Sequence, residues 1–277
     1  MSLDTTIVDC PIVIGVNVDA ESLDVENAGK GGLFGRHSYG RYGMREGVWR
    51  LLDEFARNAV KATFFFTPDD ALRHPHAVEA ILKDGHEIAL RGKVKTDPGG
   101  EPRLAWLEEE RDALERATGT RPVGWRAING LVTEATLPEL ARLGFLYDSS
   151  AQDDDQPYLM RNEEGATLVE LPVFTYLTDA SFYTHRHTDV RVAKAWAEEA
   201  DAQYCAGGYI NLTLHTRGDV GSTRLPRVAV VGDFIRKMAD RPGVAFYRAT
   251  DLAEKWCHGQ YPAEPFPTFR TPQVSLA

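Results

Sequence analysis

The sequence predicts an α/β protein built as an irregular (β/α) barrel of seven or eight parallel strands. Short apolar runs, rich in β-branched and aromatic residues, alternate along the chain with amphipathic segments of helical length. This alternation is typical of a parallel sheet with helices outside it. The 277 residues include 43% hydrophobic residues, enough for one large core, and no break in composition divides them. We therefore expect a barrel rather than an open doubly wound sheet.

Eight apolar runs are the expected strands, and the segments between them are the expected helices. One helix is expected to begin at Pro68-Asp69-Asp70, where carboxylates can cap it, and to end at Asp84-Gly85. Three longer amphipathic helices are expected over 102–118, 190–204 and 226–240. The expected strands are 12–18, 60–66, 87–90, 123–125, 145–147, 168–171, 209–214 and 244–247.

Charge and cysteine content exclude several classes of partner. Lys and Arg total 31 against 41 Asp and Glu, a net charge of −10, which argues against nucleic acid or an anionic membrane. Three cysteines at unrelated spacings favour a reduced compartment over a disulfide or zinc framework. The first residues lack a basic signal region, and the apolar run that follows is too short to span a bilayer. We expect a cytoplasmic protein that meets a small soluble substrate.

The C-terminal end differs from the rest of the chain. Its last twenty residues contain four prolines and cannot form a regular helix. We divide the chain into an N-terminal segment 1–11, a barrel domain 12–256 and a proline-rich arm 257–277. The arm is expected to cover the domain or a neighbouring subunit, so we expect a homodimer or homotetramer. Its apolar side chains are Tyr261, Phe266, Phe269, Val274 and Leu276.

Polar residues follow the first expected strand, at the end where barrels of parallel strands collect their chemistry. Asn17, Asp19 and Glu21 have period-two spacing, so in an extended strand all three point to one face. Asn17 cannot usefully accept a proton, which leaves Asp19 and Glu21 as the candidate catalytic carboxylates. The alternative is a polar strand end with Glu21 already in solvent.

Four further strand ends contribute polar residues, among them Arg126, Asp148 and His215. Arg91 and Lys95 could together hold a substrate carboxylate or stabilise an oxyanion, or form only a solvated basic patch. A desolvated Lys95 could instead lose its proton and act as a base. A lone histidine after an apolar strand is by default a packed residue, but here it converges with the other strand ends. We therefore expect these side chains to line one site.

The layout from Tyr42 to Lys95, a strand, a helix and a second strand ending in Arg91-Gly-Lys-Val-Lys95, resembles the polysaccharide deacetylase superfamily. Further resemblance lies in Gly124-Trp-Arg126 and in Leu212-Thr-Leu-His215. Tyr39-Gly-Arg-Tyr-Gly43 is similar to its cytosolic allantoinase-like and peptidoglycan deacetylase-like branch. The resemblance extends from about Ile12 to Trp256. It implies the barrel fold and hydrolysis of a non-peptide C–N bond by attack of water.

The resemblance also implies where a metal would bind, and the sequence departs from it there. The superfamily binds a divalent metal through a His-x-x-x-His pair and an aspartate, and Arg91 and Lys95 stand where the histidines would be. Asp19 matches the metal-binding aspartate, whereas Asn17 stands where the superfamily has a second acid. Guanidinium offers no lone pair, and ammonium must first lose its proton. We therefore expect neither a bound metal nor another cofactor.

Other site residues are implied by matching positions. His215 matches the histidine that protonates the leaving group, and Arg126 matches the arginine that orients the catalytic base. Asp148 is expected to pair with Arg126, either in the site or as a structural salt bridge. Glu170, in Glu170-Leu-Pro172, also has a counterpart. We expect catalysis by Asp19, Glu21, His215 and Arg126, and substrate binding by Asn17, Arg91, Lys95, Asp148 and Glu170.

Three functions remain open on these residues. The first, which we favour, is a metal-independent hydrolase, or a related lyase, of an amide, ureide or cyclic imide in a small and preferably anionic substrate. The second is a catalytically silent ligand-binding protein on the same fold. The third is a conventional metal-dependent deacetylase with other ligands, for which His37, His185 and His187 are the spare histidines.

Overall fold

The structure is a computed structural model that describes residues 9–29, 34–95, 104–259 and 261–268. Ten strands form one mostly parallel sheet in the order β10-β6-β7-β5-β4-β3-β2-β1-β8, with β9 also paired to β1. Their bounds are β1 Cys10–Val18, β2 Thr63–Phe66, β3 Glu87–Gly92, β4 Gly124–Ala127, β5 Tyr147–Asp148, β6 Tyr158–Arg161, β7 Thr167–Glu170, β8 Ile210–His215, β9 Val244–Tyr247 and β10 Ala263–Glu264.

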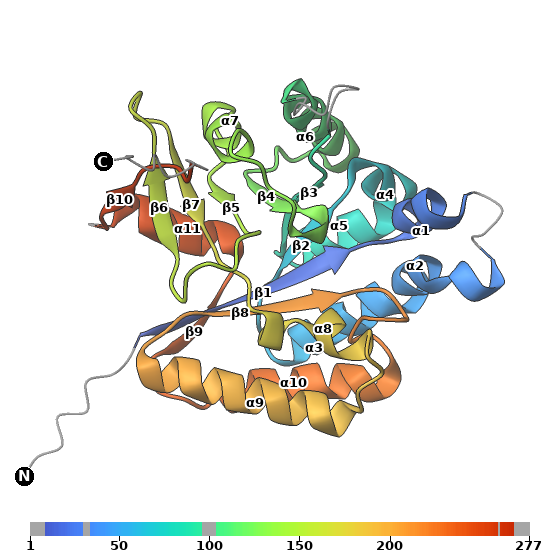
Figure 1. Cartoon of the computed structure of the whole chain (residues 1–277). Helices are drawn as coiled ribbons and strands as arrows, with labels where there is room; N and C mark the ends of the chain where they lie inside the picture. Colours follow the sequence, from blue (N-terminus) through green and yellow to red (C-terminus); the bar gives the residue numbers. More distant parts are fainter. Residues whose placement is uncertain (1–8, 30–33, 96–103, 260, 269–277) are drawn as a thin grey trace, which may run out of the picture.

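The predicted fold class is confirmed, with all eight expected strands present. β1 and β8 run in parallel through the centre of the molecule (Figure 1), and nearly every residue of β1 is buried apolar, as in sheets covered on both faces. Two short strands were not expected, β6 and β10, and β6 runs antiparallel to β7. The described strands curl without closing the barrel, because β8 and β10 remain the two ends of the sheet.

Helices cover both faces of this sheet. α9 packs on α10, which packs on α3, while α5 and α6 pack on β3 (Figure 1). The helices are α1 Glu21–Ala28, α2 Tyr39–Tyr42, α3 Val48–Arg57, α4 Pro68–Arg73, α5 Pro75–Lys83, α6 Ala105–Thr118, α7 Thr136–Arg142, α8 Asp179–Tyr183, α9 Asp189–Ala206, α10 Leu225–Ala239 and α11 Ala249–His258. In the described part of the chain, none of them has the length and apolar composition needed to cross a bilayer.

The single helix expected after β2 is wrong in two details. It is divided into α4 and α5 at His74, because the residue before a proline is disfavoured in helical conformation. Its N-cap is Thr67, whose hydroxyl accepts the Asp70 backbone N–H at 3.2 Å. Asp70 instead reaches the start of α1, where it accepts the backbone N–H groups of Ala20 and Ser22. It thereby fixes the turn that follows β1.

The C-terminal arm folds back on the domain of its own chain. β10 pairs in parallel with β6, Phe266 is buried, and Tyr261 stacks on Trp256 with ring centroids 4.4 Å apart. The expected boundary after Trp256 falls inside α11, so the arm begins only after that helix. Residues 269–277, which include three of the expected apolar side chains, lie outside the described residues.

Candidate active site

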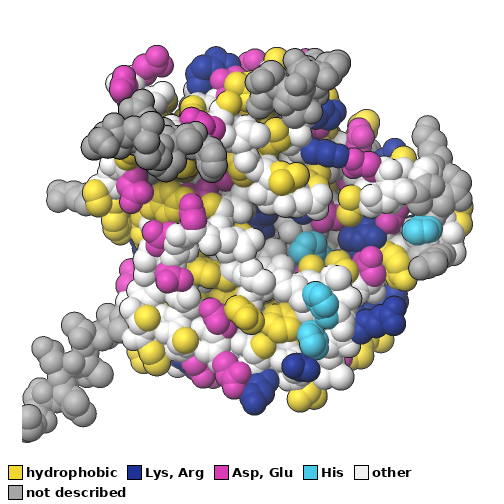
Figure 2. All heavy atoms as spheres, in the orientation of Figure 1, with side chains coloured by type: hydrophobic (Ala, Val, Ile, Leu, Met, Phe, Trp, Pro, Cys, Tyr) yellow, Lys and Arg dark blue, Asp and Glu magenta, His cyan; other side chains and the backbone are white. Residues whose placement is uncertain are grey.

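A cavity of about 450 Å³ opens at the carboxyl ends of the central strands. The register of the sheet accounts for it, because Asn17 on β1 lies beside His215 on β8, and Arg91 on β3 beside Arg126 on β4. Figure 2 shows a hollow on this face whose wall includes basic and histidine side chains. The cavity wall includes Asn17, Asp19, Arg91, Arg126, Ser149 and His215. Five predicted site residues therefore come together.

Asp19 and Arg91 form a buried ion pair on this wall. Arg91 donates from Nε to Asp19 Oδ1 at 3.0 Å and from Nη2 to Oδ2 at 3.2 Å, and its Nη1 donates to the Ala127 carbonyl at 2.7 Å. Burial opposes ionisation of Asp19, but the guanidinium outweighs it and holds the pKa of the carboxyl below its usual value. A guanidinium has five N–H groups, so two remain for a ligand.

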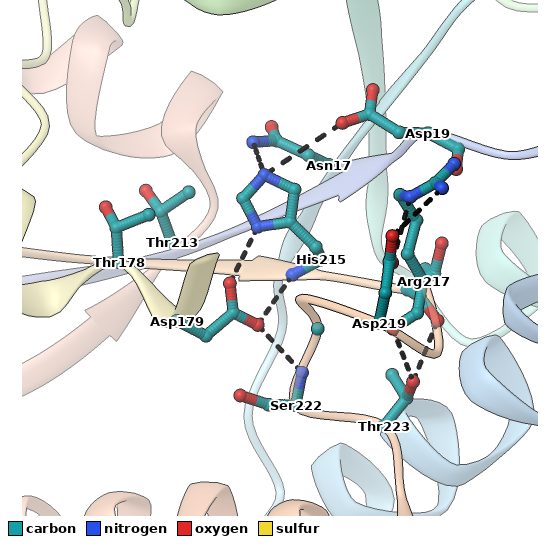
Figure 3. A network of polar contacts seen from close by, with 12 residues as sticks. Asn17, Asp19, Thr178, Asp179, Thr213, His215, Arg217, Asp219, Ser222 and Thr223 are labelled. Atoms are coloured by element: carbon teal, nitrogen blue, oxygen red, sulfur yellow. Dashed lines mark hydrogen bonds and ion pairs between the residues drawn. The ribbon is translucent and has the colours of Figure 1, made fainter. Parts of the chain in front are cut away.

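His215 is held from one side by Asp179, the first residue of α8 (Figure 3). The two are joined at 2.6 Å between His215 Nδ1 and Asp179 Oδ1. Asp179 is fully buried, and its other oxygen accepts the backbone N–H groups of His215 at 2.9 Å and Ser222 at 2.8 Å. Three donors thus stabilise this carboxylate. His215 Nε2 lies 3.9 Å from Asp19 Oδ2, which links the two pairs.

Arg126 is a buried part of the cavity wall, with its guanidinium 4.0 Å from the centroid of the Phe65 ring. It donates to the Ser149 carbonyl at 2.8 Å, to the Ser149 hydroxyl at 2.7 Å and to Asn17 Oδ1 at 3.3 Å. The expected ion pair with Asp148 is wrong, because the hydrogen-bond partners of Arg126 among the described residues are all neutral. Burial lowers the pKa of Arg126 to about 10, so it stays protonated at neutral pH.

Asp148 and Glu170, two predicted substrate-binding residues, do not reach the cavity wall. Both are fully buried, and neither is on the cavity wall, because each is overlaid by the chain from Ser149 to Ala151. Asp148 accepts the Ser150 hydroxyl at 2.6 Å, and Glu170 accepts the Ser150 and Ala151 N–H groups at 3.0 and 2.9 Å. Their remaining oxygens have no other partner, which indicates that the two carboxyls share a proton. Burial raises both pKa values, that of Asp148 to about 6.

Glu21 is also absent from the cavity wall. β1 ends at Val18, so the extended spacing that would align Glu21 with Asp19 is lost. Glu21 begins α1 and contacts His74, with 2.6 Å between Oε2 and Nε2. Its predicted catalytic role is therefore not supported by its position.

Lys95 lies in a second cavity, of about 480 Å³. Because β3 ends at Gly92, Lys95 turns away from the first cavity and places its ammonium over the Trp106 ring. Glu110 is on the same wall, and burial raises its pKa to about 7. The two cavities share three wall residues, Asp19, Leu23 and Arg91.

The search for polar residues directly after the expected strands missed Asp179. This residue follows Thr178, which makes only an isolated bridge to Thr213, and no regular strand precedes it. A buried aspartate at the start of a short helix has no sequence pattern that distinguishes it from an ordinary helix cap. Only the position of β8 beside this segment shows that Asp179 holds His215.

The donors at the expected metal position do not fit a metal ion. Both Asp19 oxygens are taken by Arg91, and neither Arg91 nor a protonated Lys95 can ligate. Among the described residues, no group of three or more His, Cys, Asp or Glu side chains is placed to hold one. His185 is exposed and His187 half-buried, with ring centroids 6.3 Å apart, and His37 lies in a separate turn.

The fold and this strand-end site define a class, the hydrolases with a deacetylase-type barrel. The polysaccharide deacetylase family profile matches residues 41–147. A crystal structure of a Mycobacterium smegmatis protein assigned to the polysaccharide deacetylases is 30% identical, covers 96% of each chain and has a TM-score of 0.85. A Pseudomonas aeruginosa PAO1 protein of the same assignment is 26% identical, with 90% of this chain and 91% of that chain covered and a TM-score of 0.76.

A curated relative, the peptidoglycan deacetylase-like protein FGM2 of Gibberella zeae, is 34% identical over 126 residues. That match covers 43% of this chain and 37% of the fungal protein. An allantoinase structure shares the fold at 24% identity, with 91% of each chain covered and a TM-score of 0.76. The chain belongs to the polysaccharide deacetylase family.

Proposed function

We propose that this protein hydrolyses a non-peptide C–N bond, in an amide, ureide or cyclic imide of a small molecule, without a metal. The observation that carries the proposal is the presence on one cavity wall of a His215–Asp179 pair and an Arg91–Asp19 pair. The first can exchange a proton, and the second supplies a fixed cation. Water activation and oxyanion stabilisation are the two needs of amide hydrolysis.

In the proposed reaction, water attacks the carbonyl carbon beside His215. The imidazole takes the proton from this water and returns it to the leaving nitrogen, while Asp179 keeps the ring in position. The carbonyl oxygen gains negative charge and accepts the two free N–H groups of Arg91. A fixed guanidinium would thus perform the electrostatic work that a metal performs elsewhere.

Alternatively, the same two N–H groups of Arg91 could bind an anionic group of the substrate, which favours an anionic substrate. Arg217, a further buried cation on this wall, is neutralised by Asp24 and Asp219 at 2.8 and 3.1 Å. We propose a cytoplasmic setting, supported by the acidic composition and by three cysteines that are all unpaired. A small molecule is proposed as the partner, rather than nucleic acid or a membrane.

The test is hydrolysis of a panel of amides, ureides and cyclic imides by protein dialysed against a chelator. His215→Ala and Arg91→Ala should each lower kcat by about 10²–10³-fold, the usual cost of losing a proton-transfer group or an oxyanion contact. His185→Ala is the matched control, because His185 is exposed and bonds only the Ser181 carbonyl of its own turn.

Full rates in both variants would exclude this site, and activity restored only by added zinc would exclude the metal-independent mechanism. The alternative function, a catalytically silent ligand-binding protein, predicts a different result. In that case no member of the panel is hydrolysed, yet small carboxylates raise the Tm of the wild-type chain and not that of Arg91→Ala.

A further inference from the structure

The side-chain amide of Asn17 has one orientation that its neighbours allow. Arg126 Nη1 lies 3.3 Å from Asn17 Oδ1, and a protonated guanidinium can only donate. The oxygen must therefore face Arg126. The amide nitrogen then faces His215 Nε2, at 3.1 Å (Figure 3), and it too can only donate. It follows that His215 Nε2 must be an acceptor, with a lone pair and no proton.

The opposite side of the ring specifies the same state independently. Asp179 is an acceptor that already takes two backbone N–H groups, so the 2.6 Å contact requires a proton on His215 Nδ1. Two neighbours that share no atom thus select one neutral tautomer, protonated at Nδ1 and bare at Nε2. Hydrogen-bond partners are what fixes the tautomer of a histidine.

Arg126 is held firmly enough to impose this orientation. Its Nε and Nη2 donate to the carbonyl and the hydroxyl of Ser149, which leaves Nη1 directed at Asn17. The absence of a side chain at Gly15 provides the space, because a Cβ there would lie 2.6 Å from Nη1. The guanidinium therefore fixes which end of the Asn17 amide faces it.

We infer that Asn17 and Arg126 are positioning residues that keep His215 in its proton-accepting form, so that His215 acts first as the base. The inference rests on the proposed hydrolysis for its catalytic consequence. The water takes the place of the Asn17 amide at the Nε2 lone pair, and one water O–H proton moves to Nε2 while the water oxygen bonds the carbonyl carbon. The C–N bond then breaks with its electron pair on nitrogen, and the Nε2 proton passes to that nitrogen. The imidazole ends in its starting state, and one water has been consumed.

A carboxylate at position 17 would reverse this arrangement. Asp is nearly isosteric with Asn but accepts through both oxygens, so it would bond Arg126 with one oxygen and a protonated Nε2 with the other. The ring would then carry two protons and could only donate one. Replacing NH₂ by O at residue 17 therefore decides whether the resting histidine is an acceptor or a donor.

The experiment is nitrogen NMR of the full chain with ¹⁵N-labelled histidines, with the His215 signals assigned by their loss in His215→Gln. At neutral pH we expect a protonated Nδ1 and a bare Nε2. A proton on Nε2, or a fast mixture of tautomers, would overturn the inference. No substrate is needed, so the result is independent of whether the hydrolase assay succeeds.

Asn17→Asp should place a second proton on the ring at the same pH. Asn27→Asp is the matched control, because it adds the same charge to the same cavity wall at an exposed residue that makes no hydrogen bond to His215. A wild-type spectrum in Asn17→Asp would refute the role of Asn17, and a doubly protonated ring in Asn27→Asp would show a general effect of charge. The expected spectra in a chain that hydrolyses nothing would count against the proposed function and support the hydrogen-bond arrangement alone.

Discussion

Two buried pairs at neighbouring strand ends, Asp19–Arg91 and Asp148–Glu170, differ in the partner that each carboxyl meets. Asp19 faces a guanidinium, and its pKa is lowered in spite of burial. Asp148 and Glu170 face each other, and burial raises both pKa values. Depth is similar in the two places, so the neighbour decides whether a buried carboxyl keeps its charge. The charged pair is on the cavity wall, and the protonated pair supports the loop behind it.

The largest expected effect comes from breaking the charged pair. Arg91→Met leaves the Asp19 carboxylate buried without its cation, which typically costs about 3–5 kcal/mol of unfolding free energy. Chemical denaturation measures this loss, and Arg121→Met, which breaks two exposed ion pairs, is the control with little change expected. A loss below about 1 kcal/mol would show that Asp19 is not held by Arg91.

This variant should also change the response to acid. The folded pKa of Asp19 is depressed, so its stabilising contribution is present above the unfolded value, near 3.8, and is lost as pH falls through the folded value. We expect the wild type to lose stability below about pH 4 by this route. Arg91→Met should not show this part of the loss of stability at low pH.

The protonated pair should respond to pH with the opposite sign. A raised folded pKa gives stability that is complete below the unfolded value and is lost as pH rises through the folded one, about 6 for Asp148. Glu170→Gln replaces the shared proton by a permanent N–H donor and can still accept from Ser150 and Ala151. We expect a gain on the order of 1–3 kcal/mol at pH 8, since one pH unit is worth about 1.4 kcal/mol.

Thermal melting of both chains from pH 5 to pH 9 measures this difference. The two Tm curves should be closest at pH 5 and separate progressively as the pH rises, because above about 4.5 the unfolded chain loses the Glu170 proton that the folded chain keeps. Parallel curves over the whole range would show that Asp148 and Glu170 do not share a proton.

The smallest expected effect on stability comes from a third region, the proline-rich C-terminal arm. We propose a homodimer or homotetramer, supported by the apolar composition of a tail of which only residues 261–268 are described. Deletion of 259–277 removes β10 and should lower the sedimentation coefficient by dissociating subunits. Because β10 also packs on β6 of its own chain, a modest fall in Tm is expected as well. An unchanged monomer in both forms would contradict the proposal.

Strand-based reasoning predicts those parts of the site that lie on the sheet. Asn17, Arg91, Arg126 and His215 converge because parallel strands bring their carboxyl ends to one edge, which alternation in the sequence is sufficient to indicate. Residues just beyond a strand are less predictable. The residue at which a strand ends depends on contacts between distant segments. One example is the contact of Asp70 with the start of α1, 50 residues earlier in the chain.

Depth and pairing are also set by tertiary contacts. The sequence shows that Asp148 and Glu170 end strands, but the chain from Ser149 to Ala151 covers them only once the sheet has formed. Asp179 is fixed by its contact with β8, 36 residues along the chain. A single sequence has no local signal for either arrangement.

The Asp19–Arg91 pair also separates two volumes, because the cavities of about 450 and 480 Å³ both include it in their walls. A ligand that draws the Arg91 guanidinium toward one cavity changes the surface that it presents to the other. Occupancy of one cavity therefore alters the free energy of filling its neighbour, and linkage requires that influence to be equal in both directions. In this fold, a cation in place of metal ligands gives two compartments a shared wall.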